Sequence, residues 1–478
     1  MISIILLLTP FLVGLAGCII SSRYTKTVAL LLTVGQLILS FVLGMQLSGS
    51  LPAFAIRWPF IPALGSSFYL GIDALSVVML LLNGIVFSLI FLYLHSPRNM
   101  GGGLFSGLLL LLQAALNGVY LIFDLLWFYI FWELALIPVF ILLIKFTAQA
   151  SLKTFLKFFI YTIAGSIVML AGIIYLGGLS REGSLSAMDL YKNVLPLHAQ
   201  TGIFLAFFAA FAVKIPLFPF HSWQPETYTQ APSVGTMALS GAMLKMALFG
   251  LLRWVLPICP AAIAAWPGHL AILLAVVGVI YASLIAISES NIKKMFAYAS
   301  MAHVGIMAAA ILSMQAAGLH GAMLFMVAHG VNAVGLFLLF DILYTRVGHF
   351  DGLSYGGIRH QLPVFSGLYL LIILASIGLP LTNGFFGEFL SLSSIFAHTP
   401  VLGALAGVSV ILGAVYMLRS YQSVFLGAGS ASLEELNFIE KLSLWIIAGL
   451  IIFMGLFPEI LLQFIRPAAD LLIKSLNL

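Results

Sequence analysis

Charged residues are scarce in this sequence: Lys, Arg, Asp and Glu make up only 7% of its 478 residues. A soluble domain carries roughly 25% charged residues, so this composition excludes an ordinary soluble enzyme or binding domain. The formal net charge is +5, but the basic residues are dispersed and form no Lys/Arg-rich run. A nucleic-acid-binding surface is therefore not indicated.

Cysteine is nearly missing as well. Only Cys18 and Cys259 are present, both in or near apolar segments, and they lack the ligand spacing of a zinc or iron–sulfur site. Any redox cofactor is therefore expected in another chain. The first apolar run, Met1 to Ile20, also lacks a preceding basic segment and a small-residue cleavage site, so we interpret it as a retained helix.

Apolar residues, in contrast, make up 62% of the chain. Apolar runs of about 18 residues or more recur along it, each long enough to cross a bilayer core about 30 Å thick. These runs lack the period-2 alternation of barrel strands, so the predicted spans are helices. We predict an all-α polytopic membrane protein with about fourteen transmembrane helices, at residues 2–22, 26–48, 71–95, 104–122, 124–146, 155–179, 200–227, 233–257, 268–288, 292–314, 317–345, 362–397, 400–426 and 440–465. The longest predicted excursions into water are Ser48 to Ser67 and the acidic stretch SLEELNFIEK.

Two predicted spans contain helix-breaking residues. The seventh reads FAVKIPLFPFHSWQPETY and the twelfth reads ILASIGLPLTNGFFGEFLSLSSIF. Proline removes a backbone donor and clashes with the preceding turn, and interrupted helices in matching positions of two halves indicate inverted repeats around an ion path. We therefore expect a single transmembrane domain over residues 1–478, with five-helix repeats at 104–257 and 268–426 and flanking helices at 1–95 and 440–478.

Six ionisable residues fall inside or at the ends of the apolar spans: Asp73, Asp124, Glu133, Lys214, Lys245 and Glu388. A charge at the centre of a membrane helix costs roughly 2.5–3.5 kcal/mol on insertion scales. For Asp73 and Asp124, near helix ends, a cap or interfacial role is favoured, and Asp73 is kept as a possible support of the ion path. The other four are predicted to be functional.

A lysine beside a glutamate can act as a proton site inside a membrane. Burial destabilises the ammonium form of lysine, and a nearby carboxylate stabilises it again. Lys214 lies about 20 Å from the start of its predicted helix, too deep for its side chain to reach water from that end. We expect the helix break to bring water and backbone dipoles to this charge. Lys245 lies about a dozen residues from either end of its helix.

Histidine binds and releases protons near neutral pH and can relay them between such sites. His303 and His329 fall inside the tenth and eleventh predicted helices, near small residues that leave room for water. The alternative, a buried histidine that only packs in the core, is less favoured because other buried charges are near. His221 follows the first break and can either take part in the path or hold the break by hydrogen bonding.

The distribution of Lys and Arg between the two sides predicts the orientation. The side of the chain termini collects Arg57, Arg181, Lys192, Arg253, Arg466 and Lys474. The opposite side collects about twice as many, namely Arg23, Lys26, Arg98, Lys145, Lys153, Lys157, Lys293, Lys294, Arg346, Arg359, Arg419 and Lys441. That opposite side is expected to be cytoplasmic, in a bacterial inner membrane or an equivalent organelle membrane, with both termini outside.

Several motifs together resemble the antiporter-like membrane subunits of respiratory complex I, the proton-pumping NADH:quinone oxidoreductase. They include GIDALSVVML, FWELALIPVF, FFIYTIAGSIVML, FAVKIPLFPFHSWQPE, QAPSVGTMALSGAMLKMALFGLLR, IKKMFAYASMAHVGIM, VAHGVNAVGLFLLFDILY and GLPLTNGFFGEF, and they cover nearly the whole length. The resemblance implies two inverted five-helix repeats within fourteen helices. It also implies a proton-translocating subunit with no redox site of its own.

The resemblance assigns roles by position. Glu133 matches the glutamate that pairs with the broken-helix lysine, Lys214 matches that lysine, and Lys245 matches the central relay lysine. His303 and His329 match the histidines between the halves, and Glu388 matches the acidic residue of the second broken helix. The implied partners are the other membrane subunits of complex I, including sister L and N subunits, and lipids. The implied flavin, iron–sulfur clusters and quinone belong to partner subunits.

Among these subunits the chain most resembles subunit M, because Glu388 stands where L and N subunits typically have lysine. The stretch Pro225 to Tyr228, Pro-Glu-Thr-Tyr, departs from the Pro-Asp-Ala-His of M subunits and is closer to the N type. Three alternatives remain: an Mrp-type cation/proton antiporter, a proton-pumping subunit of a membrane-bound hydrogenase, and an unrelated solute carrier, which is disfavoured because no organic-substrate pocket is indicated.

Overall fold

The structure is a computed structural model. It describes residues 1–20, 24–46, 52–98, 101–147, 151–180, 182–348, 356–427 and 433–476. Arg23 and Arg181, used above to predict the orientation, lie outside the described residues, as do the start of the excursion at Ser48 and the first residue of the acidic stretch.

Thirteen helical segments within the described residues are long and apolar enough to cross a membrane. They are α1 (Ile2–Ile20), α2 (Thr25–Gln46), α3 (Ala74–Tyr93), α4 (Gly103–Leu121), the bent pair α5 (Leu125–Leu134) and α6 (Leu136–Phe146), α7 (Leu152–Leu179), α9 (Leu197–Lys214), the segment Ser233–Ile258, α15 (Trp266–Ser288), α16 (Ile292–Leu312), α17 (Ala316–Val347), α21 (Pro400–Phe425) and α22 (Phe438–Leu456). The place of the predicted twelfth span is taken by α19 (Pro363–Ser376) and α20 (Asn383–His398). The predicted all-α membrane fold is confirmed.

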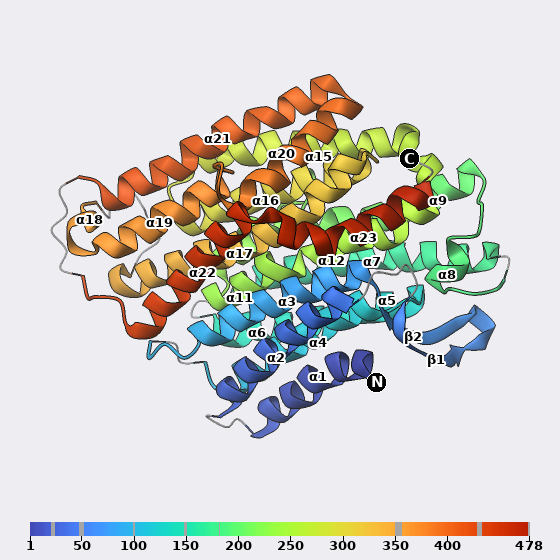
Figure 1. Ribbon diagram of the computed structural model, residues 1–478, viewed down its shortest axis with the longest axis horizontal. Helices are drawn as coiled ribbons and strands as arrows, with labels where there is room; N and C mark the ends of the chain where they lie inside the picture. Colours follow the sequence, from blue (N-terminus) through green and yellow to red (C-terminus); the bar gives the residue numbers. More distant parts are fainter. Residues whose placement is uncertain are drawn as a thin grey trace.

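The other helices are the short α8 (Ala187–Leu190), α10 (Trp223–Gln230), α14 (Pro260–Ala264) and α18 (Ile358–Gln361), and the 19-residue α23 (Pro458–Leu476), which follows α22. The segment Ser233–Ile258 consists of α11 (Ser233–Ala238), the π-helical turn η2 (Leu239–Met243), α12 (Lys245–Gly250), the π-helical turn η3 (Leu251–Val255) and α13 (Leu256–Ile258). The long helices run side by side, with the β-hairpin and α8 at one end of the bundle and α18 at the other (Figure 1). Both chain termini lie toward the end that carries the hairpin (Figure 1).

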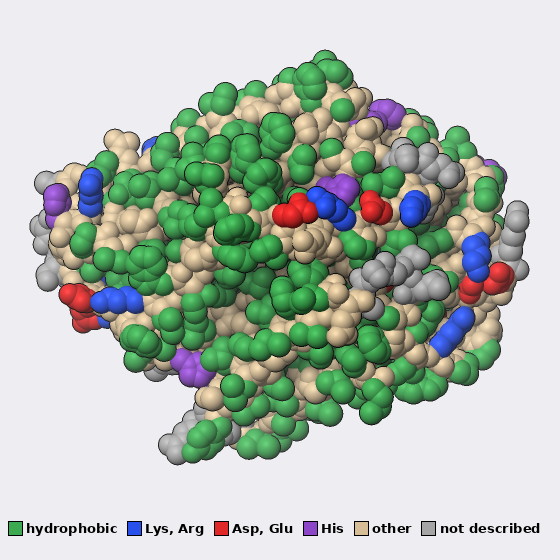
Figure 2. Space-filling model, in the orientation of Figure 1, with side chains coloured by type: hydrophobic (Ala, Val, Ile, Leu, Met, Phe, Trp, Pro, Cys, Tyr) green, Lys and Arg blue, Asp and Glu red, His purple; other side chains and the backbone are tan. Residues whose placement is uncertain are grey.

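The core is formed around Ser233–Ile258 and α17, whose most apolar windows are completely buried. Helices α1, α2 and α21 are much more exposed. The apolar residues of the outer helices therefore face outward, as lipid-facing or subunit-facing surface. In Figure 2 hydrophobic side chains cover much of the visible face, and a short row of charged side chains crosses it over α23.

The chain also contains a two-stranded sheet that the sequence analysis did not predict. Strands β1 (Ala53–Ile61) and β2 (Ser66–Ile72) pair antiparallel, with Trp58 opposite Phe68. The turn between them ends at Gly65, whose φ of 65° favours glycine. The described part of the predicted excursion from Ser48 to Ser67 therefore forms most of this hairpin. Trp58 of the hairpin is exposed, and a hydropathy search for membrane spans does not detect such a residue.

Candidate functional site

The first break in the helices lies at Lys214. Helix α9 ends at this residue, since Pro216 and Pro219 cannot donate the backbone hydrogen bonds of the next turn, and α10 begins at Trp223. The indole of Trp223 donates to the freed Val213 carbonyl at 2.8 Å, which satisfies a group that lipid would leave unpaired. The break is thus stabilised by a specific contact.

The ammonium of Lys214 occupies an unusual position. Its side chain is 1% exposed, and Nζ has no hydrogen-bond partner within the part of the chain that the structure describes. The nitrogen lies 5.3 Å from the ring centroid of Trp132, a distance suited to a cation–π contact. A buried ammonium without hydrogen bonds is costly, so this lysine is poised to release its proton or to bind water.

Glu133 lies next to Lys214 but does not hydrogen-bond to it. The carboxyl is half-buried on α5, one residue before the end of that helix, and its Oε1 has no hydrogen-bond partner among the described residues. It interacts electrostatically with Lys214. Glu133 and Lys214, which are predicted to pair, therefore interact electrostatically without a hydrogen bond between them.

Lys245 lies at the centre of the most buried segment, between the two π-helical turns. π-turns are rare and often occur at functional sites, because they displace backbone groups from the regular ladder. Here the Ser240 carbonyl of η2 accepts a hydrogen bond from Lys245 Nζ. The same nitrogen lies 2.7 Å from Nδ1 of His329 on α17. Both atoms are basic nitrogens, so one proton can be shared between them without movement of the side chains.

The second predicted histidine continues this contact. The rings of His303 on α16 and His329 lie 5.7 Å apart between centroids. Together with Ser300, Asn332 and other residues they line a cavity with room for about one water molecule. A water in such a cavity would find several polar partners, so the two histidines can exchange a proton through it.

The second break separates α19 from α20 and places Glu388 near mid-bundle. Glu388 is 6% exposed, and its carboxylate lies against Gly378, which has a φ of 77° and no room for a Cβ. Asn332 of α17 donates to the freed Ala375 carbonyl at 3.2 Å, and Asn383 donates back to Ala328 at 3.4 Å. The helix that carries His329 thereby holds the break beside Glu388.

Asp73 and Asp124 are helix caps, as favoured from the sequence. Asp73 accepts from the Ser76 amide at the start of α3, and Asp124 accepts from the Leu126 and Trp127 amides at the start of α5. Asp73 also forms a buried ion pair with Arg253.

Arg253, counted with the positive charges on the side of the chain termini, is buried inside its span. It lies in the π-helical turn η3 and is 3% exposed, because the carboxylate of Asp73 compensates its charge inside the bundle. The hydroxyl of Tyr191 donates to the Arg253 carbonyl at 2.6 Å. Burial raises the pKa of Tyr191 to about 12, so this donor stays protonated.

His221 follows the first helix break. It packs its ring against Tyr281, and its Nδ1 has no hydrogen-bond partner among the described residues, so this nitrogen does not hold the break.

The sequence analysis also missed a buried lysine–aspartate cluster. Lys293, counted with the positive charges on the side opposite the termini, is 3% exposed, donates to the Ala231 carbonyl and interacts electrostatically with Asp341. Asp341 accepts from Tyr93 Oη at 2.6 Å. Lys293 shares its helix with Ser300 and His303, and the spacing of about two and three turns is a signal that could have revealed one polar face. Ser300 in turn lies 2.9 Å from Ser240, next to Lys245.

Comparison with known proteins decides the family. A model of the family described as NADH:quinone oxidoreductase/Mrp antiporter, TM, matches residues 123–414, more than half of the chain. The chain belongs to this family. It is 34% identical to NADH-quinone oxidoreductase subunit M of Rickettsia conorii over 460 residues, which cover 94% of this chain and 93% of that protein. The predicted resemblance to the antiporter-like subunits of complex I is confirmed.

Solved structures of the family share the fold. A chain of respiratory complex I from Thermus thermophilus with bound NADH is 30% identical and superposes with a TM-score of 0.90 over 99% of both chains. A chain of the Mrp complex from Dietzia sp. superposes with a TM-score of 0.87 at 17% identity, over 98% of this chain and 96% of that chain, which shows the fold alone. This family member is therefore a multi-pass membrane protein built like a membrane subunit of complex I.

Proposed function

We propose that this chain is a proton-translocating membrane subunit of an NADH:quinone oxidoreductase. The observation that carries this proposal is the 2.7 Å contact between Lys245 Nζ and His329 Nδ1 in the most buried part of the bundle. Membrane proteins rarely bury ionisable groups unless they serve an ion or substrate path. Protons move along a relay of Glu133, Lys214, Lys245, His303, His329 and Glu388, with Asp73 and His221 in support.

The relay works because the charge of one site changes the proton affinity of the next. Two unit charges about 10 Å apart interact by about 1–2 kcal/mol at an effective dielectric constant of about 20. One factor of ten in proton affinity corresponds to about 1.4 kcal/mol. A change at Glu133 therefore alters the proton affinity of the unpartnered Lys214, and the effect passes to Lys245 and the histidines.

The relay needs an external driving event, which we assign to electron transfer in other subunits. This chain then contributes no catalytic redox residue, and the flavin, iron–sulfur clusters and quinone belong to its partners. Its position is the bacterial inner membrane, with both termini on the outer side. Both termini lie toward the end of the bundle that carries the hairpin, which supports a common side for both (Figure 1).

The partner subunits are proposed to include the sister L and N subunits. Large apolar side chains are exposed along the outer helices, for example Leu31 of α2 at 67% and Ile160 of α7 at 60%. The hairpin exposes Trp58, at 52%. Such aromatic and aliphatic surfaces fit contacts with other membrane subunits or with lipid chains.

The test is NADH-driven proton uptake by inverted vesicles that contain the intact complex. Complexes with Lys245→Met in this chain are expected to lose proton uptake attributable to it, while those with Lys145→Met, an exposed lysine at the end of α6, keep it. Normal stoichiometry in the Lys245→Met complex would overturn the relay. Sodium-dependent proton movement without NADH or quinone would instead support the Mrp-type alternative.

A further inference from the structure

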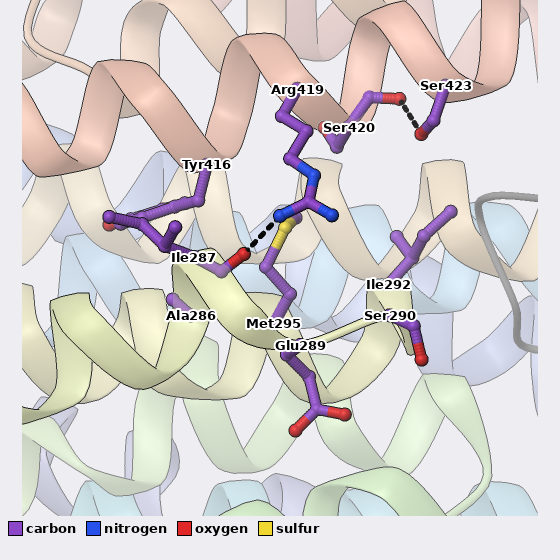
Figure 3. A pocket seen from close by; sticks show the side chains of 10 residues that line it. All are labelled: Ala286, Ile287, Glu289, Ser290, Ile292, Met295, Tyr416, Arg419, Ser420 and Ser423. Atoms are coloured by element: carbon purple, nitrogen blue, oxygen red, sulfur yellow. Dashed lines mark hydrogen bonds between the residues drawn. The ribbon is translucent and has the colours of Figure 1, made fainter.

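A surface pocket opens at the end of the bundle that carries α18. It lies between the turn that joins α15 to α16 and the last turns of α21. Its polar lining includes Glu289, Ser290, Arg419, Ser420 and Ser423. Figure 3 shows Arg419 reaching down from α21 to the Ile287 carbonyl, to which Nη1 donates at 2.6 Å. This bond ties α21 to the end of α15 and fixes the width of the pocket.

The polar lining continues into the bundle along one face of α21. Tyr416, Ser420 and Ser423 are spaced at i, i+4 and i+7, which places them on the same side of a helix. Tyr416 is 2% exposed and Ser420 is 4% exposed, whereas Ser423 is half-buried. The stripe therefore becomes steadily less accessible from the surface inward and ends at the phenol of Tyr416.

Tyr416 brings this stripe to the depth of Glu388. Helices α20 and α21 are antiparallel neighbours joined at His398 and Pro400. At about 1.5 Å per residue, Glu388 lies about 15 Å from this junction and the Cα of Tyr416 about 24 Å. Side chains on a helix tilt toward its N-terminus, so the phenol of Tyr416 points back toward Glu388. The two groups interact electrostatically.

We propose that this pocket is the mouth of a hydrated path by which Glu388 takes up protons from the side of the membrane that carries α18. The proposal rests on the proposed function and adds a separate intake for the second half of the chain. A hydronium ion in the pocket gives a proton to Tyr416 Oη as Tyr416 gives its own to the Glu388 carboxylate. The net result is one proton moved from water to Glu388, with Tyr416 unchanged.

The charged groups at the mouth are suited to collecting protons. The Glu289 carboxylate is partly neutralised by Lys294 at 2.8 Å, and Arg419 is turned toward a carbonyl. The remaining polar lining groups are hydroxyls. Those of Ser420 and Ser423 donate to the backbone carbonyls of Met417 and Ser420, and their oxygens can still accept hydrogen bonds from water. No feature of the stripe requires an organic ligand.

The test is cysteine accessibility in the assembled complex. Tyr416→Cys, Ser420→Cys and Ser423→Cys are made singly in a chain in which Cys18 and Cys259 are replaced by serine. Vesicles of both orientations are treated with a charged methanethiosulfonate reagent that does not cross membranes. All three thiols are expected to react from the side of α18, with rates that fall from Ser423→Cys to Tyr416→Cys.

Two lipid-facing positions of the same helix serve as matched controls. Val415 is 46% exposed and Leu418 is 45% exposed, and their cysteine variants should not react because hydrocarbon suppresses thiolate formation. The proposal is overturned if only Ser423→Cys reacts, or if Tyr416→Cys reacts from the opposite side. The first result would describe a pocket that ends near the surface. The second would describe a path that opens to the opposite side of the membrane.

A functional measurement separates this proposal from the proposed function. Tyr416→Phe removes the hydroxyl and is expected to lower NADH-driven proton uptake several-fold, about as much as Glu388→Gln, whereas Val415→Leu leaves it unchanged. If Glu388→Gln has no effect, the relay itself fails. If Glu388→Gln abolishes uptake and Tyr416→Phe does not, the relay stands and the intake through Tyr416 is wrong.

Discussion

Lys245 and His329 share a hydrogen bond of 2.7 Å although 84 positions separate them in the chain. They lie on the two most buried segments of the bundle, and each is at most 3% exposed. The contact joins a segment that packs against α9, which carries Lys214, to a helix that packs against α20, which carries Glu388. Four predictions follow from the contacts around this centre.

A double-mutant cycle tests whether Lys245 and His329 act as one unit. Each of Lys245→Met and His329→Ala is expected to lower the proton uptake attributable to this chain by about tenfold or more, since a positioned proton-transfer group typically contributes that much. The double variant should be no worse than either single variant, because groups that act together are not additive. Initial rates of dye quenching in vesicles measure this. His320→Ala, near the start of α17, is the control and should have no effect on proton uptake. If the losses of the two single variants add up in the double variant, Lys245 and His329 do not act as one unit.

Lys214 is predicted to be functional at a cost in stability. Its Nζ is buried without a hydrogen-bond partner among the described residues, so Lys214→Met should raise the free energy of unfolding by about 1–3 kcal/mol while it abolishes the proton uptake attributable to this chain. Denaturant unfolding in mixed micelles provides the first value and vesicle assays provide the second. The exposed Lys145→Met should change neither. If Lys214→Met instead lowers the free energy of unfolding, the ammonium of Lys214 has hydrogen-bond partners in the membrane and the prediction is wrong.

The buried ion pair of Asp73 and Arg253 is predicted to be structural. Arg253→Met leaves the Asp73 carboxylate buried without its partner, so the free energy of unfolding should fall by about 3–5 kcal/mol. The matched surface pair is Glu459 and Arg466, each more than half exposed, where Arg466→Met should cost about 1 kcal/mol or less. Thermal or denaturant unfolding of the solubilised chain measures both. Equal losses of stability in Arg253→Met and Arg466→Met would contradict a structural role for the buried pair.

The close approach of α17 and α20 depends on Gly387. A Cβ at this position would lie 2.6 Å from the backbone nitrogen of Phe325, so Gly387→Ala must push the two helices apart. The expected loss is about 1–3 kcal/mol of stability, with reduced proton uptake because Glu388 is the next residue. Gly407→Ala on α21, where nothing lies within 4 Å of the added carbon, is the control. Unfolding and uptake are measured on the same preparations.

Several features of this protein were determined by the sequence itself. The membrane spans follow from apolar runs, because the transfer of a helix into lipid depends on the sum of its own side chains. The two breaks follow from Pro216 and Pro380, since a missing backbone donor is a local property. Lys214, Lys245 and Glu388 could be singled out because a charge within an apolar run is costly wherever the run packs.

Other features were decided only by the tertiary structure. Arg253 and Lys293 sit near the ends of their spans, and whether such a charge reaches water or is buried depends on neighbours far along the chain, here Asp73 and Asp341. The hairpin depends on pairing between β1 and β2, which hydropathy does not report. The contact of Lys245 with His329 depends on how two helices pack, because hydrogen bonds need distances that no one-dimensional pattern contains.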